Sequence, residues 1–247
     1  MASTNKSIVL ITGANSGIGF ELAAQLLADA SKHILLGSRT VAKGEKAVQE
    51  LQSKNLPGTV EFLQIDVSKE ESINAAAKHV EEKHGRLDVL VNNAAIALSE
   101  GTPFTALVEV FTTNAAGPHA TVIAFESLLV KSPHTPRIIN VSSGAGSISR
   151  RLDKSNSFYA MKVEPYRVSK AALNMVSACQ HAEYEERGWK VFVYCPGYTV
   201  SNLSNHNTAA AGAKPTSEGT EPIVGMVNGD RDAEAGRFLR IGGEWEW

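Results

Sequence analysis

The feature that most constrains the fold is a regular alternation of short apolar runs with longer amphipathic stretches. The first run, residues 7–13, is rich in β-branched side chains and ends at a glycine, which is typical of a strand buried on both faces. Residues 17–30 then carry apolar side chains at helical spacing. Further strands are predicted at 33–38, 59–67, 87–95, 137–143, 190–197 and 236–241. Further helices are predicted at 42–54, 69–85, 104–115, 118–131, 165–188 and 217–228.

This alternation predicts right-handed βαβ units, because a crossover helix must return the chain to the same edge of the sheet. We therefore expect an α/β, doubly wound Rossmann fold: a seven-stranded parallel sheet with helices on both faces. The sequence contains no linker and no internal repeat, so residues 1–247 are expected to form a single domain. Residues 198–216, rich in Ser, Asn, Ala and Gly, are expected to form a mobile loop beside the substrate.

Composition excludes several classes of function. A net charge of −2, with 20% charged residues, argues against a nucleic acid or an anionic membrane as a partner. Cys179 and Cys195 are too few for a disulfide framework, and the seven histidines contain no HExxH pair, so no metal site is expected. Residues 1–13 lead directly into a strand without a leader or a membrane span, which indicates a cytoplasmic protein.

The sequence TGANSGIG, residues 12–19, lies between the first predicted strand and the first predicted helix. The pyrophosphate of a dinucleotide binds at such a helix N-terminus, where backbone N–H groups are free and glycine lets the backbone come close. The strand before it and the helix after it are the context that such a motif requires. The predicted cofactor contacts in this loop are Gly13, Asn15, Ser16, Gly17, Ile18 and Gly19.

The second predicted strand ends in GSRT, residues 37–40. An NAD site would place a carboxylate here for the ribose 2′-hydroxyl. Arg39 can instead bind a 2′-phosphate through its guanidinium fork, with Ser38 as a further donor, which favours NADP(H); the alternative is a solvated arginine at a strand end. Asp66, at the end of the third strand, could accept from the adenine amino group or cap the next helix.

These segments, together with NNAA at 92–95, the serines 142–143 and a tyrosine four residues before a lysine (Tyr166 and Lys170), resemble the short-chain dehydrogenase/reductase family. The resemblance runs from about Ile8 to Gly197 and is greatest to carbonyl-reductase-like members that use NADPH. It implies that Tyr166 is the catalytic acid/base, Lys170 its partner, Ser143 the hydroxyl that polarises the carbonyl and Asn114 the holder of a proton-relay water. It also implies cofactor contacts from Val67, Asn92, Ala94, Tyr166, Lys170, Pro196, Gly197 and Thr199. Relatives assemble as dimers or tetramers, so a homo-oligomer is expected.

The chemistry explains the pairing of Tyr166 with Lys170. An ordinary tyrosine has a pKa of about 10, and a lysine at i+4 on the same helix face is expected to lower it by favouring the phenolate. Strand alternation sends Ser142 and Ser143 to opposite faces, and the register of the family favours Ser143 as the donor to the developing alkoxide. Thr199 and Ser201 both remain candidates for the carboxamide contact.

The sequence also departs from the family pattern. Ala95 stands where the family usually has glycine. The 22 residues between Ser143 and Tyr166, residues 144–165, form a longer segment than most members have, either a lid or a tolerated surface insertion. Tyr198, Leu203 and Phe158 are expected to contact the substrate.

We therefore expect an NADPH-dependent oxidoreductase that reduces the carbonyl of a small ketone or aldehyde to an alcohol, or catalyses the reverse reaction. One alternative keeps the fold and the cofactor but assigns a non-reductive biosynthetic step, as in an epimerase, dehydratase or cyclase. Another is a non-catalytic NADP-binding regulator.

Overall fold

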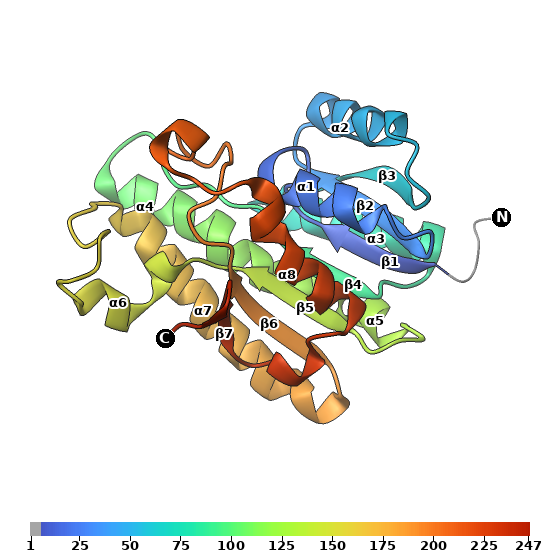
Figure 1. Cartoon of the computed structure of the whole chain (residues 1–247). Coiled ribbons are helices and arrows are strands. Elements are labelled where there is room, and N and C mark those ends of the chain that lie inside the picture. Colours follow the sequence, from blue (N-terminus) through green and yellow to red (C-terminus); the bar gives the residue numbers. More distant parts are fainter. Residues whose placement is uncertain (1–5) are drawn as a thin grey trace.

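The computed structural model describes residues 6–247 and contains the predicted alternation of strands and helices (Figure 1). The strands are β1 Ser7–Ile11, β2 Lys32–Ser38, β3 Thr59–Gln64, β4 Val89–Asn92, β5 Arg137–Val141, β6 Lys190–Cys195, β7 Phe238–Arg240 and β8 Gly243–Glu244. The α-helices are α1 Gly17–Leu26, α2 Val41–Ser53, α3 Glu70–His84, α4 Pro103–Phe111, α5 Gly117–Val130, α6 Ile148–Leu152, α7 Glu164–Tyr184 and α8 Thr216–Asn228. Residues 1–5, on which the expectation of no leader peptide partly rests, lie outside the described residues.

All strands belong to one sheet in the order β3-β2-β1-β4-β5-β6-β7-β8. Strands β1 to β7 are parallel, which confirms the predicted doubly wound Rossmann fold. The strand count was short by one, because β8 pairs antiparallel with β7. This strand is only two residues long and follows a turn with positive φ at Gly242, so no periodicity in the sequence marks it.

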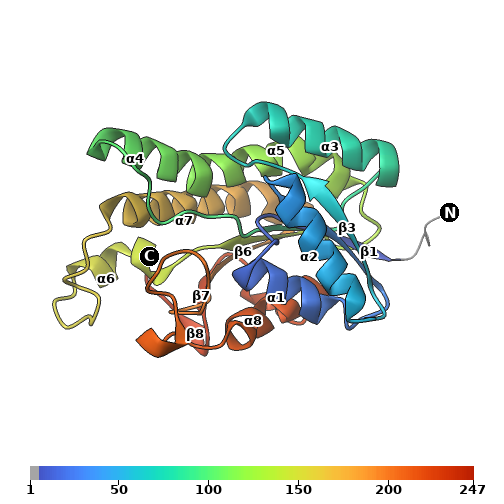
Figure 2. The ribbon, with the colours of Figure 1, turned by 90° about the horizontal axis from the view of Figure 1, so that it is seen from above.

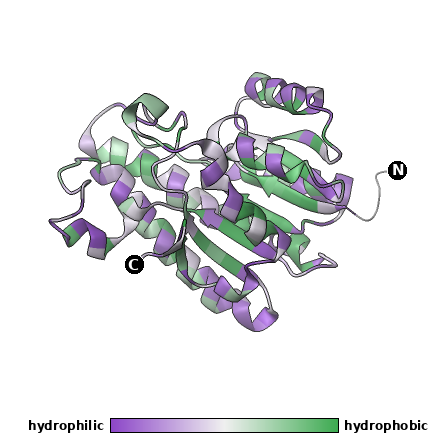
Figure 3. Cartoon of the chain, viewed as in Figure 1, coloured by the Kyte–Doolittle hydropathy of each residue, from purple (hydrophilic) through white to green (hydrophobic). Residues whose placement is uncertain are grey.

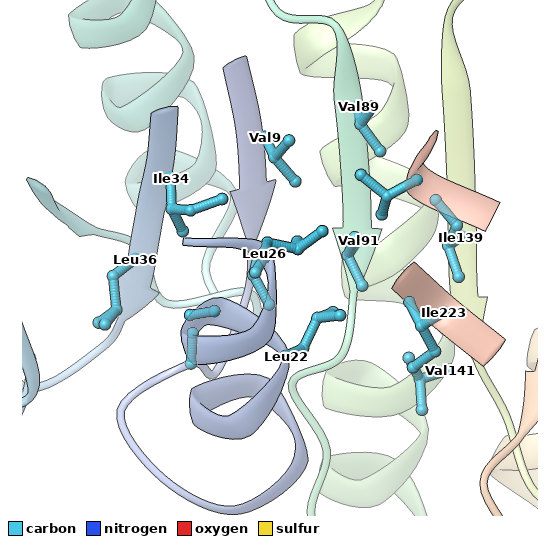
Figure 4. Close-up of a cluster of buried hydrophobic side chains, with 14 of the residues drawn as sticks. Val9, Leu22, Leu26, Ile34, Leu36, Val89, Val91, Ile139, Val141 and Ile223 are labelled. Atoms are coloured by element: carbon cyan, nitrogen blue, oxygen red, sulfur yellow. The ribbon is translucent and has the colours of Figure 1, made fainter. Parts of the chain in front are cut away.

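Helices cover both faces of the sheet, with α1, α2 and α8 on one side and α3, α5 and α7 on the other (Figure 2). Alternate residues of each strand supply the two cores. Val9 and Ile11 of β1 pack toward α1 and α8, whereas Ile8 and Leu10 pack toward α3 and α5. Figure 4 shows the first of these cores, and Figure 3 shows the apolar strands enclosed between helices whose outer faces are hydrophilic.

The predicted helix at 104–115 is in fact two elements. Helix α4 ends at Phe111, and a π-helical turn, η1, follows at Thr112–Ala116 before α5 begins. Such single π turns inside helical stretches are frequent at functional sites. This turn carries Asn114, one of the predicted catalytic residues.

The two irregular segments lie at the end of the sheet toward which the parallel strands point (Figure 1). In residues 198–216, the predicted loop beside the substrate, backbone hydrogen bonds fold the chain back on itself. The N–H of Val200 donates to the Lys214 carbonyl, and the N–H of Lys214 donates to the Tyr198 carbonyl, both at 2.9 Å. In the segment 144–165, Ser147 donates to the carbonyl of Glu246 at 2.6 Å, so this segment contacts the C-terminal tail. Within residues 6–247, no helix has both the length and the apolar character needed to cross a bilayer.

Candidate active site

A cleft of about 630 Å³ opens at the carboxyl ends of the strands. It lies where β1 and β4 are neighbours and the strand order reverses, the place at which open α/β sheets bind their ligands. Most of the predicted site residues line it: Gly13, Asn15, Ser16, Gly17, Ile18, Arg39, Asp66, Val67, Ala94, Ser143, Tyr166, Lys170, Pro196, Gly197 and Thr199. Four predicted residues do not: Gly19, Ser38, Asn92 and Asn114.

The glycines of the phosphate loop are required by the backbone. Gly13 and Gly17 have φ angles of 65° and 56°, in the left-handed region that side chains disfavour. A Cβ at Gly13 would also lie 2.8 Å from Cα of Ala94. Gly19 serves packing instead of ligand contact, because a Cβ there would lie 2.5 Å from the Asn93 side chain and 2.9 Å from Cα of Ala14.

The first turn of α1 presents an open set of backbone donors to the cleft. Across residues 6–247, no side chain caps this turn, and the turn itself contains no acidic residue. The free N–H groups and the positive end of the helix dipole therefore fit a phosphate group.

The cleft near the carboxyl end of β2 contains two basic side chains besides the predicted Arg39. Arg39 lines the cleft together with Lys43 and Lys46 of α2, one turn apart. The sequence could have indicated these two contacts, because both lysines lie in the first turns of the helix that follows Arg39. Ser38 is not an added donor in this conformation, because it is buried and its hydroxyl donates to the carbonyl of Thr40 at 3.1 Å.

Asp66 and Val67 line the cleft at the end of β3. The helix-cap alternative for Asp66 is wrong: Lys69 occupies the N-cap of α3, and the Asp66 carboxylate accepts from the backbone and hydroxyl of Ser68 at 3.1 and 2.7 Å. The adenine contact remains open for Asp66.

Of the two adjacent asparagines at the end of β4, only the second, Asn93, reaches the cleft. Asn92 is buried and donates to Asn140 of β5 at 2.8 Å, so it braces the sheet and does not line the cleft. Asn93 does line it, and donates to the carbonyls of Thr12 and Gly13 at 2.9 and 3.2 Å. The reason is strand alternation, which turns adjacent side chains to different surroundings.

Ser143, just after β5, and Tyr166 and Lys170, on α7, converge on the cleft. Pro165 stands in the first turn of α7, so Tyr166 lies near the N-terminus of that helix and Lys170 one turn further on. Ser143 interacts with the phenol of Tyr166 and accepts from the backbone of Ala145 at 3.2 Å. Ser142, although it borders the cleft, donates its hydroxyl to Asn174 at 2.5 Å, which favours Ser143 as the donor to a substrate.

Asn114 lies behind the cleft. Its amide accepts from the backbone N–H of Ile96 at 2.9 Å, and donates to the Ile96 carbonyl at 2.7 Å and to Ser169 at 3.0 Å. Through these bonds it joins the π turn to the segment after β4 and to α7.

The electrostatics of the tyrosine–lysine pair differ from expectation. Desolvation raises the pKa of Tyr166 to about 12, although the Ser143 hydroxyl opposes the rise. Lys170 is not among the groups that shift this pKa; its ammonium donates to the Val141 carbonyl at 2.8 Å and lies 5.8 Å from the centre of the tyrosine ring. Burial lowers the pKa of Lys170 itself to about 8. The predicted lowering of the tyrosine pKa by its lysine is therefore wrong for the protein alone.

Beyond β6, Thr199 and Ser201 both line the cleft, so the choice between them stays open. The Thr199 hydroxyl donates to the Pro196 carbonyl at 2.9 Å. Leu203 also lines the cleft as predicted. Tyr198 and Phe158 do not; their rings pack against each other with centres 6.1 Å apart.

Comparison with known proteins agrees with this geometry. The family model described as short chain dehydrogenase matches residues 7–212. The short-chain dehydrogenase anuI of Penicillium roqueforti is 38% identical over 231 residues, covering 91% of this chain and 89% of that protein. Carbonyl reductase (NADPH) 1 of Sus scrofa is 32% identical over 200 residues, 78% of this chain and 67% of that protein. The crystal structure of NADPH-bound carbonyl reductase from chicken fatty liver superposes with a TM-score of 0.79 at 28% identity, covering 98% of this chain and 100% of that one.

The chain therefore belongs to the short-chain dehydrogenase family, and the resemblance to its carbonyl-reductase-like members is confirmed. Membership makes it an oxidoreductase of the class that acts on CH–OH and C=O groups.

Proposed function

We propose that this chain is an NADPH-dependent reductase of a ketone or aldehyde, also able to catalyse the reverse oxidation, that works as one catalytic domain. The observation that carries the proposal is the convergence of Ser143, Tyr166 and Lys170 on the same cleft as an open phosphate loop. A pure NADP sensor would not need these three side chains together.

The residues of the cleft fit a dinucleotide phosphate. Gly13 and Gly17 allow close approach of the phosphates, and the uncapped first turn of α1 would bind the pyrophosphate. Arg39, Lys43 and Lys46 would bind the 2′-phosphate, where a guanidinium fork matches its oxygens. When bound, the nicotinamide would supply or accept the hydride.

Side chains of the protein would transfer the proton to the carbonyl oxygen. An ordinary tyrosine, with a pKa of about 10, is protonated at neutral pH. Burial raises the pKa of Tyr166 further, so it is in the form that donates a proton to a carbonyl oxygen. Ser143 would donate a hydrogen bond to the same oxygen and stabilise the developing alkoxide. Lys170 is positively charged below a pH of about 8, and would hold the ribose hydroxyls of the cofactor. Asn114 would orient the backbone of Ile96 and hold a water in the proton path.

The first test is NADPH oxidation, followed by absorbance, across a panel of aliphatic, aromatic and polycyclic ketones and aldehydes. We expect turnover of at least one compound and formation of the matching alcohol. A chain that binds NADPH but oxidises it with no carbonyl compound, while converting a hydroxylated substrate without net redox change, would instead favour the epimerase, dehydratase or cyclase alternative.

We also propose that the protein forms a homo-oligomer through the helices α4, α5 and α7. Phe104, Ile123 and Met175, one on each helix, are 75%, 56% and 66% exposed. Figure 2 shows these three helices on the same side of the sheet, and exposed apolar groups favour burial by association. Light scattering after size exclusion should give a dimer or tetramer. The double substitution F104E/M175E should shift it toward monomer, whereas L152E on α6, at an equally exposed leucine, should not. A monomeric wild-type protein at tens of micromolar would contradict the proposal.

A further inference from the structure

A second group of potential ligands lies at the opposite end of the sheet from the cleft. His33 is at the start of β2, Glu61 is in the edge strand β3, and His84 ends α3. One ligand atom from each, a ring nitrogen from either histidine and a carboxylate oxygen, lie within 4.8 Å of one another. The three side chains are 17%, 23% and 7% exposed, so the cluster is largely shielded from solvent.

The sheet register brings these residues together. Leu35 of β2 pairs with Glu61, and His33 pairs with Thr59, so His33 and Glu61 are diagonal neighbours. Both lie on the same face as Leu35, which belongs to the core under α3. The end of α3 then places His84 above them.

One oxygen of Glu61 faces both histidines. Its Oε1 lies 2.8 Å from Nε2 of His84 and 3.8 Å from Nε2 of His33, while Oε2 bonds to Lys83 at 2.6 Å. The contact with the Lys83 ammonium fits an ionised carboxylate, which is the form that binds a metal.

His33 is oriented as a ligand before any ion arrives. Its Nδ1 lies 2.8 Å from the hydroxyl of Thr59, whose own proton points to the Lys32 carbonyl at 3.5 Å. In the tautomer in which the Thr59 oxygen accepts from Nδ1–H, Nε2 carries the free lone pair. Within residues 6–247 this buried Nε2 has no hydrogen-bond partner, because 3.8 Å to Glu61 is too long. A ligand histidine whose other nitrogen donates to a neighbour is the usual arrangement around a metal.

We propose that His33, Glu61 and His84 form a binding site for a divalent transition metal of the Zn²⁺ class, with water as the fourth ligand. Two imidazoles and one carboxylate are a donor set that suits Zn²⁺ and disfavours Mg²⁺ or Ca²⁺. Tetrahedral Zn²⁺ with bonds of about 2.0–2.2 Å separates its ligand atoms by roughly 3.3–3.5 Å, so side-chain shifts of an ångström or so would close the site. His84 would move its ring proton from Nε2 to Nδ1.

The end of α3 favours a cation at this place, whereas two lysine side chains, Lys83 beside Glu61 and Lys6 at 3.4 Å from the Thr59 hydroxyl, act against it. His84 lies in the last turn of α3, where the helix dipole favours positive charge. Lys83 binds the oxygen of Glu61 that faces away from the histidines, and with 51% of its side chain exposed it can turn toward solvent. A bound ion would join β2, the edge strand β3 and the end of α3. The site would therefore stabilise the edge of the sheet.

The test uses the full chain after removal of metal with a chelator. We expect calorimetry to show Zn²⁺ binding at this site, and Co²⁺ to give the visible absorption of a tetrahedral ion that Zn²⁺ then abolishes. At a hundredfold excess over the dissociation constant, Zn²⁺ should raise Tm by about 5–10 °C, and Mg²⁺ should leave it unchanged.

The variants H33Q and H84Q should weaken Zn²⁺ binding at least about a hundredfold and remove the cobalt spectrum, whereas T59V should weaken binding about ten- to a hundredfold. H79Q is the matched control, since His79 is exposed on the same helix outside the cluster. Circular dichroism and Tm of the metal-free variants verify that they fold. Absence of Zn²⁺ and Co²⁺ binding to the wild type at about 100 micromolar metal, or equal binding by H84Q and H79Q, would overturn the proposal.

Discussion

Replacing Tyr166 with phenylalanine should lower kcat for ketone reduction by about 10²–10⁴-fold, the range over which a positioned proton donor accelerates reactions. The ring remains at the start of α7 and only the hydroxyl facing Ser143 is lost. Binding of NADPH, titrated through nicotinamide fluorescence, should therefore change little. Steady-state kinetics with the best substrate of the ketone panel gives the measurement.

The matched control is Y159F, because Tyr159 is an exposed tyrosine of the segment 144–165 and does not line the cleft. It should keep wild-type turnover. If Y166F turned over as fast as Y159F, Tyr166 could not be the proton donor, whereas a lost affinity for NADPH would point to damage of the cleft and not to loss of acid catalysis.

The substitution R39D should reverse the cofactor preference. A charge-assisted hydrogen bond to phosphate contributes about 1.5–3 kcal/mol, so its loss should raise the KM for NADPH by roughly 10–100-fold. The new carboxylate would repel the 2′-phosphate and could accept from the 2′-hydroxyl of NADH. Lys43 and Lys46 line the same part of the cleft, so some affinity for NADPH should survive.

The ratio of kcat/KM for NADPH to that for NADH is the deciding quantity. K78D makes the same change of charge on the exposed face of α3, and should leave this ratio as it is in the wild type. An R39D enzyme with an unaltered ratio would show that Arg39 is a solvated arginine at a strand end. The 2′-phosphate would then have to be bound by the two lysines, or not at all.

Local sequence patterns predicted the elements with strong periodicity. The β-branched run of β1 and the amphipathic α1 are of this kind, as is the start of α7 at Glu164 with Pro165 in its first turn. Gly13 and Gly17 were also predictable, because a turn between a buried strand and a helix needs positive φ.

The sequence could not reveal features that depend on atoms brought together in space. The π turn at Asn114 reads as continuous helix, since one extra residue in a turn barely alters an apolar pattern. The raised pKa of Tyr166 reflects desolvation in the folded protein, which the i+4 spacing to Lys170 does not define. His33, Glu61 and His84 come from three separate elements, so no short motif joins them.

Strand β2 separates the cluster around His33 from the phosphate site around Arg39. The distance between them determines how strongly charges at the two sites interact. Six residue steps connect His33 to Arg39, which amounts to about 20 Å of extended chain. In physiological salt, charges interact appreciably over only about 8 Å, the Debye length. A cation bound at His33 would therefore have almost no electrostatic effect on a phosphate bound at Arg39. Occupancy of the metal site should change the stability of the edge of the sheet. The preference for NADPH or NADH should depend only on the residues around Arg39.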